Sequence, residues 1–314
     1  MSDYRLPPVR FDSPPMDVSS LSQQTDWGLK QHRMPELWKR SAGEGVLVIV
    51  LDTGIPRHGD LPEPLFTANF TTDTSAFDRN GHQTHCAGIV AAKNNENGVV
   101  GWAPNATLAH IKVLSDRGSG RSNWIASGIA YGTKLWNQRK SDFIGCIMSM
   151  SLGGGFDRGQ ESAIAQANES GIVVIAAAGN SGFRGGRSTV DHPGASANTI
   201  GVAAYRSDGQ IARFSSGGPE VDIAMPGEEI LSTVPGNRYQ VMSGTSMATP
   251  AAAGLLACVL ASRPLDRSIR NTLGMREFLT KHVADRGEAG KDNRFGFGVP
   301  IGNDLIRDPE YWMF

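Results

Sequence analysis

Short runs of apolar residues alternate along the chain with longer stretches in which apolar residues recur every three or four positions. The run at residues 46–51 is β-branched and continuously apolar, which is typical of a strand buried on both faces of a parallel sheet. The alanine-rich segment 246–261 is apolar on all sides, which predicts a buried helix. The pattern predicts further strands at 107–113, 143–150, 172–177, 199–204 and 221–225, and further helices at 82–93, 123–136, 160–168 and 273–282.

This alternation of strands and helices predicts the fold class. Repeated strand–helix units favour an α/β fold of three layers, in which a mainly parallel central sheet carries helices on both faces. In such sheets ligands bind beyond the carboxyl ends of the strands. We expect a proline-bearing N-terminal extension (1–25), one main domain (26–306) and a short C-terminal tail (307–314). The acidic and aromatic tail is expected to pack either on the main domain or across a second copy, so a homodimer stays open.

Composition narrows the range of partners and compartments. The net charge is −1 and there is no long basic run, which disfavours nucleic-acid binding. The three cysteines are isolated in the sequence, as is typical of buried free thiols in a reducing compartment. No apolar stretch follows the first residues and no run approaches 18 apolar residues, so we expect a cytoplasmic protein without a membrane partner.

Three polar residues follow predicted strands or begin predicted helices. Asp52 follows a strand in VLVIVLDTG, His82 begins a helix in NGHQTHCAG, and Ser246 begins another in SGTSMATPAAAG. A serine becomes a nucleophile when a histidine takes its proton and a carboxylate orients that histidine. In VVIAAAGNSG, the Asn180 amide follows a buried strand and is placed to donate to a developing oxyanion, together with the backbone N–H of Ser246.

The motifs VLDTG, GHQTHCAG, MSLGGG, AAAGN and GTSMATPAAAG occur in this order, and residues 27–305 resemble the subtilases, the subtilisin-like serine peptidases. The resemblance implies a subtilisin-like fold and an endopeptidase that cleaves protein or peptide substrates through an acyl-enzyme. It implies Asp52, His82 and Ser246 as the triad, with Asn180 as oxyanion donor. A maturation peptidase for one precursor and an inactive peptide-binding relative remain as alternatives.

The residues that follow the proposed base require separate interpretation. His85 lies one helical turn after His82, and we expect a hydrogen-bonded structural histidine rather than a metal ligand. We expect Cys86 to be a packed thiol that mercurials reach. Gln83 replaces the glycine usual in the family, and we expect it to make the cleft narrower or more polar near the S2 side.

The resemblance also implies a groove for an extended peptide. One wall and part of the S1 pocket, which receives the side chain on the acyl side of the cleaved bond (P1), are formed by Ser151, Leu152 and Gly153. The opposite wall is formed by Gly118, Ser119 and Gly120, and the pocket floor by Ala177, Ala178 and Gly179. This floor carries no charge, so we expect a large apolar or aromatic P1 residue.

A calcium site is expected in the asparagine-rich loop after the base helix. Amide and carbonyl oxygens are the hard ligands that calcium takes. The resemblance implies ligation by the side chains of Asp60, Asn95 and Gln23, and by the backbone oxygens of Lys93, Asn97 and Val99.

The extension YRLPPVRFD resembles the short N-terminal extension of intracellular subtilisins. The resemblance implies an inhibitory arm that crosses the active site through Leu6, Pro7, Pro8 and Val9. Proline lacks an N–H and interrupts strand pairing, which would keep the arm from being cut there. Removal is expected within residues 13–22, so the chain would be made as a zymogen; a disordered tail is the alternative.

Overall fold

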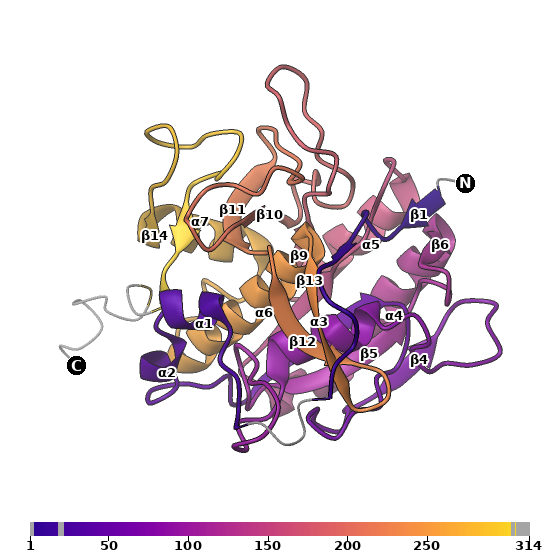
Figure 1. Ribbon diagram of the computed structural model, residues 1–314. Helices are drawn as coiled ribbons and strands as arrows, with labels where there is room; N and C mark the ends of the chain where they lie inside the picture. Colours follow the sequence, from indigo (N-terminus) through magenta and orange to yellow (C-terminus); the bar gives the residue numbers. More distant parts are fainter. Residues whose placement is uncertain (1–2, 18–21, 303–304, 306–314) are drawn as a thin grey trace.

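The computed structural model describes residues 3–17, 22–302 and 305, and this part forms an α/β fold of three layers (Figure 1). Within the described residues, the central sheet has the order β11-β10-β9-β7-β3-β5-β4, with every neighbouring pair parallel. The predicted fold class is therefore confirmed. The strands of this sheet are β3 (Val46–Asp52), β4 (Thr67–Asn69), β5 (Thr107–Lys112), β7 (Gly145–Met150), β9 (Ile172–Ala177), β10 (Ile200–Tyr205) and β11 (Val221–Pro226).

Helices cover both faces of the sheet because its central strands are apolar on both sides. Alternate residues of a strand point to opposite faces, so Val46, Val48 and Val50 of β3 enter one core cluster while Leu47, Ile49 and Leu51 enter the other. The first cluster includes α3 (His82–Ala91), α6 (Thr245–Ser262) and α7 (Thr272–His282), and the second includes α4 (Ser122–Arg139) and α5 (Arg158–Glu169).

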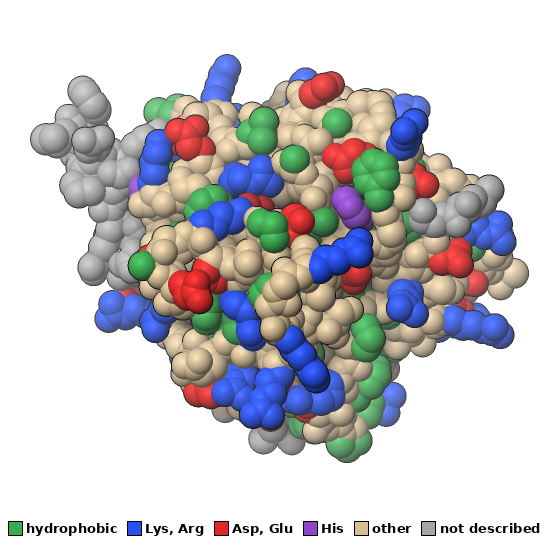
Figure 2. All heavy atoms as spheres, turned by 90° about the horizontal axis from the view of Figure 1, so that it is seen from above, with side chains coloured by type: hydrophobic (Ala, Val, Ile, Leu, Met, Phe, Trp, Pro, Cys, Tyr) green, Lys and Arg blue, Asp and Glu red, His purple; other side chains and the backbone are tan. Residues whose placement is uncertain are grey.

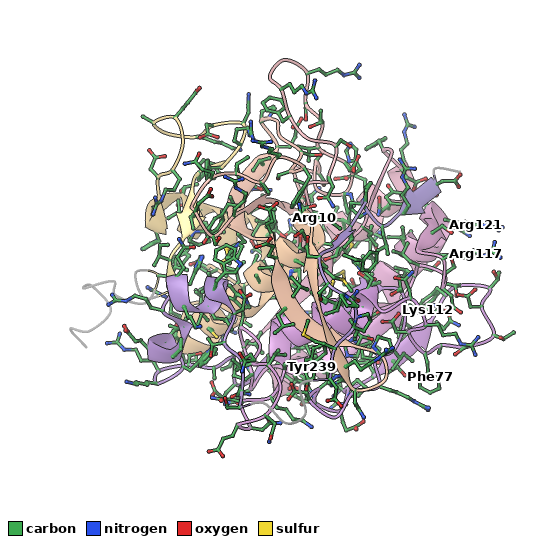
Figure 3. The ribbon with its side chains drawn as sticks, viewed as in Figure 1. Arg10, Phe77, Lys112, Arg117, Arg121 and Tyr239 are labelled. Carbon is green, nitrogen blue, oxygen red and sulfur yellow. The ribbon has the colours of Figure 1, made fainter. Side chains whose placement is uncertain are left out.

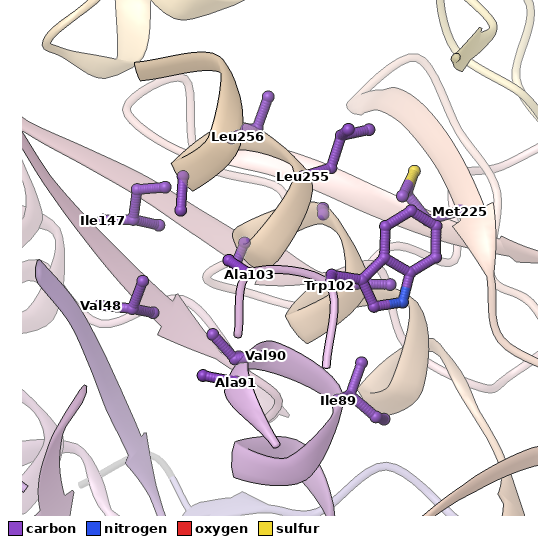
Figure 4. Packing of buried hydrophobic residues seen from close by; sticks show 14 of the residues in the cluster. Val48, Ile89, Val90, Ala91, Trp102, Ala103, Ile147, Met225, Leu255 and Leu256 are labelled. Carbon is purple, nitrogen blue, oxygen red and sulfur yellow. The ribbon is translucent and has the colours of Figure 1, made fainter. Parts of the chain in front are cut away.

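Helix α6 lies in the middle of the first cluster. Leu255 and Leu256 pack near Trp102 and Ala103, and Ile147 of the sheet lies beside them (Figure 4). The helix is long and apolar enough to span a membrane, but 89% of that span is buried inside the fold. Its apolar character on all sides is explained by this burial between the sheet and its neighbours.

The apolar pattern did not predict the short elements, whose pairing depends on residues far apart in the chain. The hairpin of β12 (Ile230–Val234) and β13 (Arg238–Ser243) is extended by β2 (Arg10–Phe11) of the N-terminal extension. A second small sheet contains β6 (Ser119–Arg121), β1 (Asp3–Arg5) and β8 (Gly153–Gly154). The remaining short elements are α1 (Trp27–Gln31), α2 (Met34–Leu37), η1 (Lys140–Asp142), β14 (Val283–Ala284) and β15 (Val299–Pro300).

The surface agrees with the balanced composition. On the face seen in Figure 2, acidic and basic side chains are mixed, and hydrophobic side chains occur in small separate groups. The C-terminal tail at 307–314, for which we predicted packing on the main domain or on a second copy, lies outside the described residues.

Candidate active site

The four predicted catalytic residues lie where strands end and helices begin. Asp52 is the last residue of β3, which lies between β5 and β7, and His82 is the first residue of α3. Ser246 is in the first turn of α6, and Asn180 follows β9 by three residues. The carboxyl ends of parallel strands share one edge of a sheet, so the fold gathers these side chains at one place.

The acid and the base form a buried, hydrogen-bonded pair. Nδ1 of His82 lies 2.8 and 2.9 Å from the two carboxylate oxygens of Asp52. Burial by itself would lower the pKa of His82, but the charge and hydrogen bond of Asp52 hold that pKa well above 6.5. The pairing fixes the ring so that Nε2 is the atom left for proton transfer, and among the described residues Nε2 has no hydrogen-bond partner.

Ser246 and Asn180 belong to neighbouring segments and contact other groups. The Ser246 hydroxyl donates to the carbonyl of Ser151 at 3.5 Å, and the Ser246 side chain is buried. Oδ1 of Asn180 accepts from the backbone N–H and the hydroxyl of Thr245, which turns the amide nitrogen outward. That nitrogen donates to the backbone carbonyl of Pro8 at 2.9 Å. The amide that we predicted as the oxyanion donor is therefore bound to a carbonyl of the N-terminal extension.

Sequence reasoning did not identify Asp78, which organises the start of α3. Its Oδ1 accepts from the hydroxyl of Thr53 and the N–H of Gly81, both at 2.9 Å. Its Oδ2 accepts from the N–H and hydroxyl of Thr84. The carboxylate thus fixes the segment that carries His82 to the end of β3. An acidic residue four positions before the base, close to a helix N-terminus, was the available signal.

The expectation for Gln83 is wrong. Its side chain is fully buried and points beneath α3, away from the cleft. Oε1 accepts from the N–H of Gly54 at 2.8 Å, and Nε2 lies 3.2 Å from the carbonyl of Val50 and 3.0 Å from Nδ1 of His110. Buried backbone and ring groups need partners, so the residue ties α3 to the sheet.

His85 and Cys86 have the expected structural environments. Nε2 of His85 is 2.9 Å from the carbonyl of Gln240, and burial lowers the pKa of His85 to about 3. Cys86 is a buried free thiol whose sulfur lies 3.4 Å from the carbonyl oxygen of Ser246 and 3.8 Å from Nδ1 of His82. Burial raises the pKa of Cys86, so it is a packed thiol rather than a nucleophile.

The two predicted walls of the groove face each other across the N-terminal extension. Strand β1 pairs antiparallel with both β6 and β8: Tyr4 lies opposite Gly120 and Gly154, and Arg5 lies opposite Ser119 and Gly153. The chain thus occupies the groove as a central strand, in the way that an added peptide strand would. Figure 1 shows the extension beginning beside β6 and then running to β13.

Tyr4 anchors this strand. Its side chain is fully buried in the cluster of α4 and α5, and its hydroxyl donates to the carbonyl of Gly155 at 2.6 Å and also contacts Gln160. The Leu6 N–H donates to the carbonyl of Gly118 at 2.9 Å. A cavity of about 250 Å³ at the active site is lined by Leu6, Pro7, Pro8, Val9, Phe11, Asn80, His82 and Met242.

The predicted uncharged S1 pocket is not what the structure contains. The segments at 151–153 and 177–179, which we predicted to line this pocket, both adjoin the Asp191 carboxylate. A Cβ built on Gly153 would lie 2.8 Å from Oδ2 of Asp191, and one built on Gly179 would lie 2.5 Å from it. Burial raises the pKa of Asp191 above 3.8, while the charges of Arg5 and His192 oppose that rise. The prediction failed because Asp191 is twelve positions beyond the floor glycine in the sequence.

The six predicted calcium ligands also converge. The backbone carbonyls of Lys93, Asn97 and Val99 lie 2.7, 3.3 and 3.2 Å from the side-chain amide nitrogen of Gln23. Asp60 is buried beside them, 3.2 Å from the Asn95 amide. A half-turn of the Gln23 amide exchanges its nitrogen for its oxygen, which leaves a set of carbonyl, amide and carboxylate oxygens. This donor set fits calcium.

Comparisons with known proteins agree with the motif order. The family model described as "Subtilase family" matches residues 43–298. A protein of Paenibacillus polymyxa named "Intracellular serine protease" is 44% identical over 253 residues, which are 77% of this chain and 75% of that protein. "Thermostable alkaline protease" of Halalkalibacterium halodurans and "Subtilisin E" of Bacillus subtilis are each 40% identical over 247 residues. The match covers 78% and 77% of this chain but only 65% and 63% of those two relatives.

Proposed function

The chain belongs to the subtilase family and is a serine endopeptidase of the subtilisin type; from this premise we propose that Asp52, His82 and Ser246 are its catalytic triad and Asn180 its oxyanion donor. The observation that carries the proposal is the hydrogen bond between Nδ1 of His82 and the Asp52 carboxylate, whose two oxygens both lie within 2.9 Å of that nitrogen. Ser246 and Asn180 follow from their positions at the start of α6 and after β9.

The proposed reaction follows from the groups at the ends of β3, α3 and α6. Oγ of Ser246 attacks the carbonyl carbon while Nε2 of His82 takes the hydroxyl proton. The Asn180 amide donates to the oxyanion that forms, and the proton on His82 passes to the leaving amine as the C–N bond breaks. Water then loses a proton to His82 and attacks the acyl-enzyme, and Ser246 leaves with that proton. Asp52 keeps the ring oriented throughout and stabilises the imidazolium that forms.

We further propose that the enzyme is made as a zymogen, with residues 3–17 as the inhibitory arm. The arm fills the groove from Tyr4 to Val9, and the Pro8 carbonyl occupies the Asn180 amide. Pro7 and Pro8 have no N–H, so the pairing of β1 with the two walls of the groove ends at Leu6. With the arm in place the Ser246 hydroxyl points to Ser151 and not to His82. These contacts support an arm that binds like substrate but resists attack.

Calcium is proposed as a structural ion. It would be held by Asp60, Asn95 and Gln23 through their side chains and by the three backbone carbonyls of the loop. Its role is to join the chain that leads out of the arm to the loop after α3. The reaction itself uses only the residues of the active site.

The working compartment is proposed to be the cell interior. Two observations favour it: the Paenibacillus polymyxa relative is named as intracellular, and Cys86, Cys146 and Cys258 are all buried free thiols. Protein and peptide substrates follow from the family. A maturation peptidase for one precursor would use the same residues and would differ only in the range of proteins that it cuts.

The Ser246→Ala variant tests the triad. We expect a folded protein with unchanged circular dichroism, no labelling by a fluorophosphonate probe, and a loss of casein hydrolysis of about 10⁶-fold. The Ser262→Ala variant at the end of α6 is the matched control and should keep full labelling. Retained turnover by the alanine variant at position 246 would overturn the assignment.

A time course of the full chain with calcium tests the arm. Intact mass and casein hydrolysis are followed together. Loss of an N-terminal segment before activity rises supports the zymogen, whereas immediate hydrolysis by the uncut chain contradicts it. The chain with Tyr4→Gly, which lacks the buried anchor, should become active sooner.

A further inference from the structure

We propose that Asp191 makes the S1 pocket selective for lysine and arginine, so that the enzyme cleaves on the carboxyl side of basic residues. The inference rests on the proposed function, because it concerns the substrate of the same site. It replaces the expectation of a large apolar P1 residue.

The position of Asp191 follows from hydrogen bonds on both sides of its segment. The Asp191 N–H donates to the carbonyl of Ala178 on one wall of the pocket, at 3.0 Å. The next residue, His192, exchanges two hydrogen bonds with Gly154 on the other wall, at 2.8 and 3.1 Å. The segment therefore bridges the two predicted walls of the pocket.

The carboxylate of Asp191 faces inward from this bridge. One oxygen, Oδ2, lies close to the positions that a Cβ would take on both Gly153 and Gly179. Because Gly153 and Gly179 belong to opposite predicted walls, Oδ2 of Asp191 lies between those walls. The missing side chains at Gly153 and Gly179 are what leave room for the carboxylate there.

Two cationic groups act on Asp191 without pairing with it: Arg5, which belongs to the arm, and His192. Among the described residues, Asp191 forms no ion pair and its side chain accepts no hydrogen bond, and it is only partly exposed. By contrast, Asp78 and Asp222 are buried carboxylates with several donors each. A partly desolvated carboxylate that has neither an ion pair nor a hydrogen bond is stabilised by a cation. Once the arm and its Arg5 are removed, the long side chain of a P1 lysine or arginine brings that cation from the substrate.

The arm agrees with this assignment. In the register of β1, Arg5 lies opposite Gly153 and its charge acts on Asp191, so the arm itself brings a cation toward this carboxylate. Leu6 then pairs with Gly118, and the prolines follow at the active site. Between Arg5 and Lys30, Arg10 is the only basic residue. Its side chain is 52% exposed. Arg10 pairs with Ser243 at one end of β13, far from Tyr239 near the other end (Figure 3). Removal of the arm by another copy would therefore occur after Arg10, and not within residues 13–22, which contain no lysine or arginine.

The test compares kcat/KM for succinyl-Ala-Ala-Pro-X-p-nitroanilide with X as Lys, Arg or Phe, using the full chain after incubation with calcium. The ratio of two kcat/KM values does not depend on the fraction of active enzyme. We expect Lys and Arg to exceed Phe by about tenfold or more. The isosteric Asp191→Asn variant should lower the Lys/Phe ratio by about 10- to 100-fold while changing the Phe value little. Salt should lower the ratio for the unmodified chain alone.

Two controls make the outcome decisive. Asp208→Asn removes an exposed carboxylate that lies outside the groove and should leave the ratio unchanged. Asp191→Gly removes the charge and widens the pocket, and should favour Phe. A Phe preference in the unmodified chain, or a ratio unchanged in Asp191→Asn, overturns the inference. Fluorophosphonate labelling of Ser246 separates the two failures: labelling with a Phe preference sinks only the S1 assignment, whereas no labelling and no turnover sink the proposed function.

Discussion

At the scale of single residues, position 83 controls how the helix with the base is attached to the sheet. Gln83 contacts Gly54, the carbonyl of Val50 and the ring of His110, all of them buried. Among the described residues, Gln83 is the hydrogen-bond partner of both the Gly54 N–H and the His110 ring. A residue that replaces a glycine has therefore become part of the hydrogen-bonding core beneath the active site.

Substitution of Gln83 by leucine keeps a similar volume and removes three polar contacts. A buried group left without a partner costs about 1–3 kcal/mol, so we predict a fall of that size in the free energy of unfolding. Urea denaturation in the Ser246→Ala background, which prevents self-digestion, measures it. The exposed Gln138→Leu change on α4 is the control and should have little effect. Equal stability of both variants would mean that Gln83 is dispensable.

The protonation of His82, the proposed base, is expected to set the acid limit of activity. The ring must be neutral to accept the Ser246 proton, and Asp52 holds the pKa of His82 well above 6.5. Activity should therefore increase as the pH rises through that higher value, so the acid limb of the kcat/KM profile is predicted above pH 6.5. The profile is measured with a small anilide substrate after arm removal. An acid limb below pH 6.5 would contradict the assigned influence of Asp52.

At the scale of elements, the long segments could be predicted from the sequence and the short ones could not. Strand β9 has the same bounds as its predicted segment at 172–177, because its apolar run is buried on both faces. The pairing of β1 with β6 and β8 depends on glycine backbones more than a hundred residues away, which no local pattern shows. Asp52, His82 and Ser246 were found because each adjoins a strongly patterned element, whereas Asp191 lies in a loop without such a pattern.

The loop after α3 gives a prediction for calcium. Binding to the folded state alone stabilises it by RT ln(1 + [Ca²⁺]/Kd), about 2.7 kcal/mol at a hundredfold excess over Kd. We predict that EDTA lowers the melting temperature of the Ser246→Ala protein and that Asp60→Asn removes most of the calcium response. Asp208→Asn should respond to calcium like the parent. The same melting temperature with and without calcium in the parent would contradict the site.

At the scale of the whole molecule, buried ionisable groups from distant elements decide how the fold responds to acid. Burial lowers the pKa values of His32 and His85 to about 3 and that of His110 to about 4. His32 follows α1, His85 lies within α3 and His110 lies within β5. The folded state therefore requires neutral histidine rings both in the first core cluster and beneath the active site. Burial raises the pKa of Asp26 to about 6, which acts in the opposite direction.

The directions of these pKa shifts predict that acid lowers the free energy of unfolding. Below pH 6.5 the unfolded chain protonates three histidines that the folded chain keeps neutral, while between pH 6 and 4 folded Asp26 takes up one proton more than unfolded Asp26. The net difference is about two protons, so the free energy of unfolding should fall by roughly 3 kcal/mol per pH unit in that range. His82 adds no slope there, because a raised pKa gives stability that is complete below 6.5.

Urea titrations at pH 7.5, 6 and 5 in the Ser246→Ala background measure the fall. His32→Gln, which can still bond Tyr205, should reduce the slope by about one proton. The exposed Gln138→Leu control should not, and a slope shared by all three proteins would show that the buried rings are not its source.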